Sequence, residues 1–343
     1  MKPGDLIRSG WWIVVAAAAV SMVVAVWVVR LPRDGTAGGP RPFVLEPCLV
    51  DPDEVVRAMA PDGLVALTDP ATLTPAEVDR RNESERGKLL VPSDRVVGVD
   101  LGGERRAYPL RLLRWHEVVN DVVGGRAVAV ASSPLSGSLA VWDRTIDGRT
   151  LELGVSGRLL DSTTLMYDRR PDGGASSLWH QLTGQAIAGP LAGRRLRPMP
   201  AEIATWGRWR TAHPDTTVLA PDPGSLPLYK RDPYHSYRGS DVLRFPVDPL
   251  PPAGALARKD PVAIVTADNL DAAFPLRYLA DAVGSARGTW VAPIGERVYR
   301  IHFDADEGTV AAEPNDPGDD PPAVRLASWF AWYAAHPDTV PLP

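Results

Sequence analysis

Cysteine is nearly absent from this chain of 343 residues, since Cys48 is the only one. A single thiol excludes an intramolecular disulfide, a zinc finger and a Cys-x-x-Cys redox pair. The chain also lacks blocks of lysine and arginine, and its formal net charge is -5, so no nucleic-acid partner is expected. Neither a cofactor nor a resident metal is expected.

Hydrophobic residues are plentiful, at 45% of the chain, which is enough to form a buried core and excludes disorder of the whole chain. The counts of 35 prolines and 30 glycines are both high and predict many turns and short helices. The length allows one large or two small domains.

An uncharged hydrophobic run, WWIVVAAAAVSMVVAVWVV, occupies residues 11–29. As a helix it spans about 28 Å, close to the roughly 30 Å hydrocarbon core of a bilayer. Trp11, Trp12 and Trp27 lie near its ends, where indoles favour the membrane interface. We expect a retained transmembrane anchor over residues 11–30. A cleaved signal peptide is the alternative, but its apolar core is usually only about 7–15 residues long.

The segments around the anchor bear on topology. Residues 1–10 form a short N-terminal tail, and the polar residues 31–42 are expected to be a flexible linker. Basic residues on the two sides of the run balance, so the positive-inside rule does not decide the orientation. Because an N-terminal anchor before a large domain most often exports that domain, we expect a single-pass protein of the cell membrane with its bulk extracytoplasmic.

The rest of the chain contains an internal repeat. Residues 108–111 (YPLR) match residues 274–277 (FPLR), and each follows a strand-like segment. Further on, two tryptophans three apart precede the sequence HPDT, both at residues 206–216 and at residues 329–339. The predicted parts are an N-terminal extension that packs on the first module (43–93), a full module (94–247) and a shortened module (258–343).

Local signals in the first module predict strands around tight turns. RVVGVDL and RRAYPL indicate a hairpin around Gly102-Gly103, and RAVAVAS and SLAVWDR indicate strands on either side of residues 134–137. Pro109 opens a predicted helix over residues 109–123, which carries apolar residues at helical spacing. The predicted class is α+β, mostly antiparallel β with short helices, following the N-terminal transmembrane helix.

Four longer motifs occur in order: WHEVVND (115–121), GVSGRL (154–159), MYDR (166–169) and QLTGQAIAGPLAG (181–193). Together they resemble a bacterial family known as domain of unknown function 3179, over about residues 64–247 and more weakly in the second module. The resemblance implies an exported or membrane-anchored protein. It implies no particular reaction.

One departure from the family pattern concerns residues 133–137. Family members typically read Cys-Pro-Leu-Cys-Gly where this chain has Ser133-Pro134-Leu135-Ser136-Gly137. Two thiols on such a turn can bind a soft metal or form a redox pair, whereas two hydroxyls do neither well. If the family site is thiolate-based, the resemblance implies that this member has lost it.

The polar residues of WHEVVND form the first candidate site. On the predicted helix, His116 and Asn120 share one face, and Glu117 and Asp121 form a second pair four apart. His116 beside Glu117 could be a general base or a metal ligand with a carboxylate behind it. The alternative is that His116 and Asn120 bond to neighbouring strand backbone and fix the helix in place. The second module lacks the WHE sequence, which favours a special role in the first.

Ser133 and Ser136 form the second candidate. Either hydroxyl could be a nucleophile activated by His116. However, no G-x-S-x-G elbow surrounds them, and a tight turn between two strands is the alternative.

A third group is predicted to lie on paired strands, as an aromatic wall with polar ends that could line a small-ligand pocket. The alternative is a core tryptophan with a solvent-facing histidine, Trp179 and His180. The repeated histidines of HPDT, His213 and His336, are interpreted as structural. The third group comprises Tyr167, Asp168, Trp179, His180 and Gln181.

These observations favour a membrane-anchored extracytoplasmic protein with a binding or scaffolding role and a degenerate family site. Its partners would be the membrane, through residues 11–29, and a small ligand or a protein. The alternative is a metal-dependent or redox enzyme, and a Ser-dependent hydrolase is a further one. The enzyme pocket would be formed by His116, Glu117, Ser133, Ser136 and His180.

Overall fold

The computed structural model describes residues 43–84 and 88–339, which belong to one unit, Pro42–Pro343. The hydrophobic run at residues 11–29 lies outside the described residues. Within the described ranges, none of the helices combines the length and apolarity needed to cross a membrane. The anchor therefore stays a prediction from the sequence.

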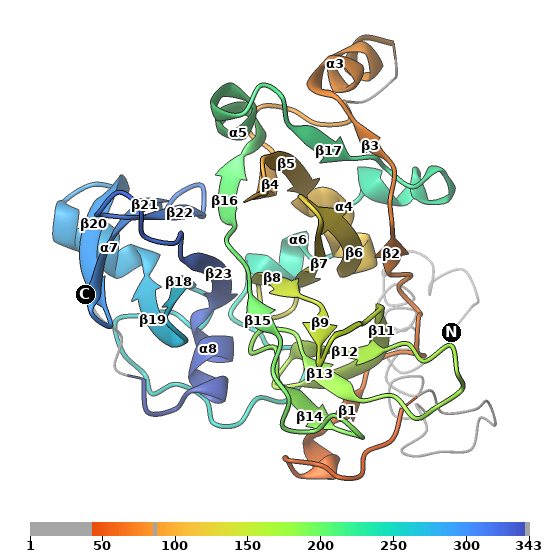
Figure 1. Cartoon of the computed structure of the whole chain (residues 1–343). Helices are drawn as coiled ribbons and strands as arrows, with labels where there is room; N and C mark the ends of the chain where they lie inside the picture. Colours follow the sequence, from red (N-terminus) through yellow and green to blue (C-terminus); the bar gives the residue numbers. More distant parts are fainter. Residues whose placement is uncertain (1–42, 85–87, 340–343) are drawn as a thin grey trace, which may run out of the picture. The chain divides into compact units, whose positions relative to one another are not determined.

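Strands dominate the described chain, and most pair antiparallel, as the sequence predicted (Figure 1). The first large sheet has the order β19-β18-β23-β8-β7-β6-β2, with β15 also paired to β8. Strand β2 runs parallel to β6. The strands are β2 (Leu67–Thr68), β6 (Val118–Val123), β7 (Arg126–Ser133), β8 (Ser138–Asp143), β15 (Arg197–Pro198), β18 (Pro261–Ala267), β19 (Leu270–Pro275) and β23 (Ala323–Ser328).

The second large sheet has the order β20-β21-β22-β16-β4-β5-β17-β3. The predicted hairpin around Gly102-Gly103 is present as β4–β5. The strands are β3 (Thr72–Leu73), β4 (Arg95–Leu101), β5 (Glu104–Pro109), β16 (Glu202–Thr205), β17 (Thr217–Leu219), β20 (Arg287–Ile294), β21 (Arg297–Asp304) and β22 (Thr309–Pro314).

A smaller sheet has the order β1-β11-β12-β13-β14, and a short hairpin, β9–β10, stands apart from it. Within this sheet, β12 and β13 pair antiparallel. The bounds are β1 (Val56–Arg57), β9 (Thr145–Ile146), β10 (Arg149–Thr150), β11 (Leu153–Leu160), β12 (Thr163–Asp168), β13 (Leu178–His180) and β14 (Ala186–Ala188).

The helices are short, as the proline and glycine content predicted. They are α3 (Pro75–Ser84), α4 (Leu110–His116), α5 (Trp206–Ala212), α6 (His235–Arg238), α7 (Leu276–Val283) and α8 (Trp329–Ala335). Single turns of 3-10 helix are η1 (Pro52–Glu54), η2 (Pro223–Ser225) and η3 (Leu228–Lys230).

The predicted helix over residues 109–123 is wrong beyond His116. Helix α4 ends there, because Glu117 has a φ of 57° that no helix continues, and its N–H donates to Leu113 O to close the last turn. The following VVNDVV then forms strand β6. The reason is that β-branched valines fit a buried strand better than a helix. The spacing of the apolar residues alone did not distinguish a helix from a strand in this segment.

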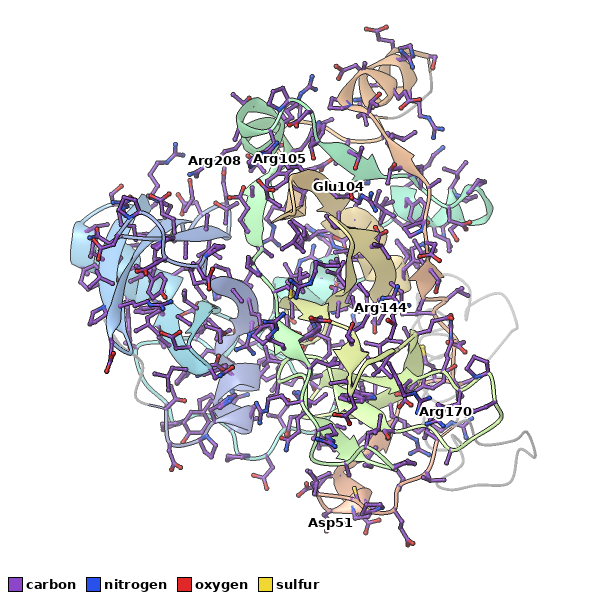
Figure 2. The ribbon with its side chains drawn as sticks, viewed as in Figure 1. Asp51, Glu104, Arg105, Arg144, Arg170 and Arg208 are labelled. Carbon is purple, nitrogen blue, oxygen red and sulfur yellow. The ribbon has the colours of Figure 1, made fainter. Side chains whose placement is uncertain are left out.

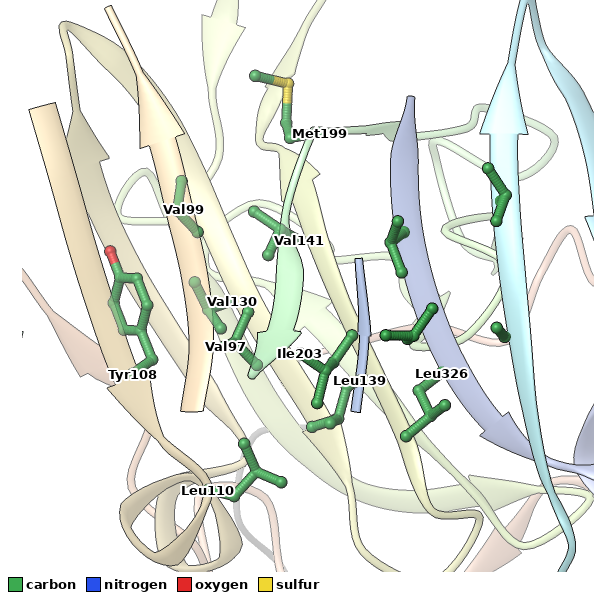
Figure 3. Packing of buried hydrophobic residues seen from close by; sticks show 14 of the residues in the cluster. Val97, Val99, Tyr108, Leu110, Val130, Leu139, Val141, Met199, Ile203 and Leu326 are labelled. Atoms are coloured by element: carbon green, nitrogen blue, oxygen red, sulfur yellow. The ribbon is translucent and has the colours of Figure 1, made fainter. Parts of the chain in front are cut away.

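The central layer is the first large sheet, because both of its faces are buried. Strand β7 illustrates this: Val128 and Val130 pack in the largest core cluster against the second large sheet. The alternate residues Ala129 and Ala131 pack on the other face against the small sheet. Figure 3 shows the first of these clusters. The hairpin β7–β8 therefore ends inside the protein, and the turn at its end is buried.

The two repeated stretches fold with the same order of elements (Figure 1). Each begins with a hairpin and a helix, continues with a three-stranded meander, and ends with a strand and a second helix. In the first these are β4–β5, α4, β6–β7–β8, β16 and α5, with β9 to β15 inserted between β8 and β16, and in the second β18–β19, α7, β20–β21–β22, β23 and α8. The module boundaries at residues 94–247 and 258–343 remain predictions.

The repeated tryptophans and HPDT sequences differ in their surroundings. In the first repeat Trp209 lies over Gly98, where an added Cβ would be 2.2 Å from the indole ring. Trp209 Nε1 donates to Thr216 Oγ1 at 2.8 Å. In the second repeat Ile264 stands in the position of Gly98, and Trp332 Nε1 has no hydrogen-bond partner among the described residues.

Candidate functional site

The turn between β7 and β8 carries the two serines that replace the family's cysteines. Gly137 closes the turn with a φ of 63°, a conformation that favours glycine. Ser133 and Ser136 are both fully buried. Ser136 Oγ donates to Ser133 O at 3.3 Å and lies 2.8 Å from Ser138 Oγ. The alternative of a tight turn is therefore right, but the turn is enclosed by the protein.

Glu117 brings a carboxyl group to this turn. Its positive φ at the end of α4 directs the chain from the helix into β6. The side chain is buried, and Thr164 Oγ1 on β12 donates to Glu117 Oε2 at 2.8 Å. Burial raises the pKa of Glu117 from 4.5 to about 7, although the hydrogen bond from Thr164 works in the opposite direction.

Thr164 links Glu117 to Ser133. The Thr164 N–H donates to Ser133 Oγ at 3.0 Å, and the two hydroxyl oxygens lie 3.1 Å apart. Because the single Thr164 hydroxyl proton points to an ionised Glu117, the Ser133 hydroxyl then donates to Thr164. The result is a buried hydrogen-bonded chain, Ser133–Thr164–Glu117. Ser133 ends β7, Thr164 lies on β12, and Glu117 caps the end of α4.

A second arm continues the network on the other side of the turn. Ser138 Oγ donates to Gln181 Oε1, and Gln181 Nε2 donates to Ala131 O at 2.9 Å. Gln181 O accepts a hydrogen bond from Trp142 Nε1 at 3.1 Å. Gln181 therefore joins the site as a residue that holds the turn to the small sheet.

Helix α6 contacts this turn through Tyr237. Tyr237 OH donates to Leu135 O at 2.8 Å. Burial, followed by the nearby charge of Glu117, raises the pKa of Tyr234 to about 12. Lys259 Nζ lies 3.4 Å from the centre of the Tyr237 ring and donates to Tyr237 O at 2.6 Å. These contacts keep the turn enclosed.

His116 does not share this site. Its Nδ1 lies 2.7 Å from Val65 O, and its Nε2 is hydrogen-bonded to Tyr229 OH. Burial lowers the pKa of His116. His116 therefore bonds to a backbone carbonyl and a phenol, which is the structural alternative, and neither Ser133 nor Ser136 is among its partners.

Asn120 and Asp121 lie on β6, so the predicted helical pairs, His116 with Asn120 and Glu117 with Asp121, are wrong. Asn120 bonds to both backbone groups of Leu153, at 2.8 Å each. Asp121 pairs with Arg106 at 2.6 Å and accepts from Tyr108 OH at 2.8 Å. The two side chains on this strand therefore hold neighbouring elements together.

Arg144, labelled in Figure 2, adds to that function. Its NH1 donates to Leu151 O at 2.7 Å, and its NH2 donates to Asp121 O at 3.4 Å. The charged and amide groups around β6 thus bond mainly to backbone, which is typical of structural polar groups in a core.

The predicted aromatic wall does not form. Strands β12 and β13 pair, but Trp179 lies opposite Met166 in one core cluster, whereas Tyr167 packs with Leu178 in another. Because neighbouring strand residues point to opposite faces, the two rings are separated by the sheet. Trp179 donates to Asp168 Oδ1 at 3.0 Å, and burial raises the pKa of Asp168.

His180 is buried, so its predicted solvent-facing alternative is wrong as well. Its Nδ1 accepts a hydrogen bond from Thr183 N at 3.3 Å. Burial, followed by the charges of His336 and Arg195, lowers its pKa to about 4. Such a histidine stays neutral at physiological pH. The enzyme pocket predicted from five residues therefore reduces to Glu117, Ser133 and Ser136.

Sequence reasoning missed Thr164 and Ser138. Thr164 belongs to DSTTLMYD, where a pair of threonines precedes an apolar strand, and Ser138 follows the turn glycine. Both are small hydroxyl residues in buried strands, a pattern that indicates hydrogen bonding inside a core. The long-range contact between the end of β7 and β12, through Ser133 and Thr164, was not visible in the sequence.

Among residues 43–84 and 88–339, no group of three or more His, Cys, Asp and Glu side chains could hold a metal ion. An open surface pocket of about 390 Å³ lies elsewhere, where α3 meets the HPDT turn of the first repeat. Its lining is Thr74, Pro75, Ala76, Asp79, Arg210, Pro214, Asp215 and Thr216, and none of these is a predicted site residue.

Comparison with known proteins supports the family resemblance that the four motifs indicated. Neither the curated proteins nor the solved structures gave a match. A family model described as a protein of unknown function, DUF3179, matches residues 62–325. The match is longer than the stretch that carries the motifs and extends into the second repeat. Since it covers well over half of the chain, the protein belongs to the DUF3179 family.

Proposed function

We propose that the protein is a membrane-anchored extracytoplasmic domain with a binding or scaffolding role, in which the family site has become part of the core. The observation that supports this most directly is the hydrogen bonding of the serine turn. Ser133, Ser136, Thr164 and Glu117 bond to one another and are all buried. Groups satisfied in this way stabilise a fold without needing a substrate.

The charge and acid–base arrangement also supports binding over hydrolysis. Neither serine has a histidine partner, because His116 bonds to Val65 and Tyr229, and His180 accepts from Thr183. A serine nucleophile needs an adjacent base within hydrogen-bond reach. Two hydroxyls and one carboxyl are also weak ligands for a soft metal.

Metal content and ester hydrolysis of the full-length protein in detergent decide between binding and catalysis. We expect less than about a tenth of a metal ion per chain after purification without chelator, and no turnover of activated esters above that of a Ser133→Ala variant. One bound metal per chain that is lost in Glu117→Gln would overturn the binding role. Ester turnover that disappears in Ser133→Ala but persists in Ser136→Ala would do the same.

A second candidate, proton-transfer catalysis, is favoured by one specific observation. Glu117 has a pKa of about 7 and is joined through Thr164 to Ser133. A general base works best when its pKa is near the operating pH. This candidate predicts ester turnover with a bell-shaped or sigmoid pH profile that shifts in Thr164→Val.

The location rests on the sequence run at residues 11–29, and Cys48 provides a test of it. Cys48 is the only cysteine of the chain, it is partly exposed, and it follows the predicted linker. A membrane-impermeant maleimide applied to intact spheroplasts should label the protein, and Cys48→Ser should abolish labelling. Labelling that requires lysis would place the domain in the cytoplasm. Release of the protein by carbonate extraction would contradict the transmembrane anchor.

A further inference from the structure

The strand order of the two large sheets shows an exchange between the repeats. One sheet joins β19-β18-β23 of the second repeat to β8-β7-β6 of the first. The other joins β5-β4-β16 of the first repeat to β22-β21-β20 of the second. Each repeat therefore places its hairpin in one sheet and its meander in the other, beside the complementary part of its partner.

The two junctions are the same contact made twice. Leu326 on β23 pairs with Leu139 on β8, and Ile203 on β16 pairs with Val310 on β22. Ile203 and Leu326 each stand three residues before the first tryptophan of their repeat. Leu139 and Val310 each stand two residues after a turn glycine with positive φ.

In a two-fold symmetric dimer, residue i of one copy contacts residue j of the other, and residue j of the first contacts residue i of the second. The two junctions between the repeats follow this reciprocal pattern. Figure 3 shows Leu139, Ile203 and Leu326 within the largest core cluster, so both junctions meet in the same core. That cluster includes buried residues of both repeats, among them Val97 and Tyr108 from the first and Phe274 and Ile301 from the second.

We infer that the second module is the binding partner of the first, within one chain, and that neither module is a separate folding unit. The surface that the first module would present to a second copy of itself is occupied by the described part of the second module, residues 258–339. This assignment rests on strand pairing and burial, and it is independent of the proposed function.

The connection between the modules allows a direct test. Between the end of β17 and the start of β18 the described chain forms no strand, and residues 252–255 are exposed. A specific protease site can replace residues 252–255 in the full-length protein, so that the chain folds intact and is cut afterwards. The uncut variant is the control.

After cutting, we expect both pieces to elute together in detergent at the position of the uncut chain and to unfold in a single transition. Pieces that separate in native buffer, or that unfold in two independent transitions, would overturn the inference. A second measurement uses the cut protein with Ile203→Ala and Leu326→Ala, one change at each junction. The urea concentration that separates the pieces should fall by at least a quarter.

Leu165→Ala is the matched control, since Leu165 is equally buried but belongs to the small sheet. Because both pieces unfold in one transition, it should lower the urea midpoint of unfolding, but dilution in native buffer should not separate its pieces, whereas dilution should separate those of the junction variant. If the junction variants and the control behave alike, the pairing at the junctions does not hold the modules together, and the inference fails.

Discussion

The turn at residues 133–137 and the turn at residues 304–308 occupy equivalent places in the two repeats. Their glycines have the same conformation, but their side chains differ. Gly137 and Gly308 close them with nearly equal φ values, 63° and 62°. In the first, Ser133 and Ser136 are enclosed and bond to Thr164 and Ser138. In the second, Glu307 stands exposed in the position of Ser136. The comparison teaches that the turn is a property of the repeat, whereas the buried polar network belongs only to the first module.

The largest effect is expected where the repeats pack their tryptophans differently. Gly98→Ile introduces the residue that the second repeat carries at this position, but Trp209 occupies the space for a side chain. Overpacking a core costs about 1–3 kcal/mol, and contact at 2.2 Å with a rigid ring puts this variant at about 3 kcal/mol or more. Thermal unfolding should show the loss.

Ile264→Val is the control for that comparison. It removes one methylene group from the second repeat and should cost about 0.5–1.5 kcal/mol. Equal losses in the two variants would show that the repeats pack alike, contrary to the structure.

The second effect concerns pH. The folded protein holds the pKa of Glu117 near 7 rather than 4.5, so its protonated form favours the fold. This stabilisation is complete below pH 4.5 and is lost as the pH rises to 7. Over pH 4 to 8 the difference amounts to about 3 kcal/mol. Glu117→Gln should gain stability relative to wild type by that amount across this range, measured by urea unfolding.

Two comparisons keep the pH experiment specific. His180 titrates in the opposite direction, because its lowered pKa removes stability as the pH falls from 6.5 towards 4, but it is common to both proteins and cancels. Ser136→Ala, which removes no ionisable group from the same turn, should give a profile parallel to wild type. A parallel profile for Glu117→Gln would mean that Glu117 is not buried as described.

The third effect separates the two serines. Ser133→Ala removes the acceptor of the Thr164 N–H and leaves that group buried without a partner. The expected loss is about 1–3 kcal/mol, against about 1 kcal/mol for Ser136→Ala. Denaturant unfolding of both variants checks the order, and a larger loss for Ser136→Ala would contradict the hydrogen-bonded chain.

The smallest effect compares the two HPDT sequences. Thr216→Val removes the acceptor of Trp209 Nε1 and should cost about 1 kcal/mol. Thr339→Val should cost less than about 0.3 kcal/mol, because Trp332 Nε1 makes no hydrogen bond with the described residues. Calorimetry of the two variants gives the difference, and equal costs would remove this distinction between the repeats.

Local features of the fold could be predicted from the sequence, because turns and β-branched runs act over a few residues. The hairpin at Gly102-Gly103 and the strands around residues 134–137 are examples. The predicted helix over residues 109–123 is wrong from Glu117 onward. The positive φ of Glu117 accompanies its buried contact with Thr164 and the turn into β6. Such a conformation has no local signature.

The candidate site was also predictable only in part, because its motifs are local but its contacts join residues far apart in the sequence. Ser133, Ser136 and Glu117 were recognised from their motifs, but their true partner, Thr164, approaches from a strand that pairs elsewhere. His116 was the leading candidate on the predicted helix, and Glu117 was added as the carboxylate beside it. Adjacent residues at the end of a helix point in different directions, so Glu117 reaches Thr164 while His116 reaches Val65 and Tyr229.

The strand exchange also governs when the protein can fold during synthesis. Strand β8 meets β23, and β16 meets β22, so both large sheets keep open edges until almost the whole chain has been made. Pairing over such long sequence separations slows folding, and open edges invite aggregation. A chain that stops before residue 309 lacks both closing strands. An unfinished chain of this kind keeps its strand edges unpaired, which favours aggregation and cleavage by proteases.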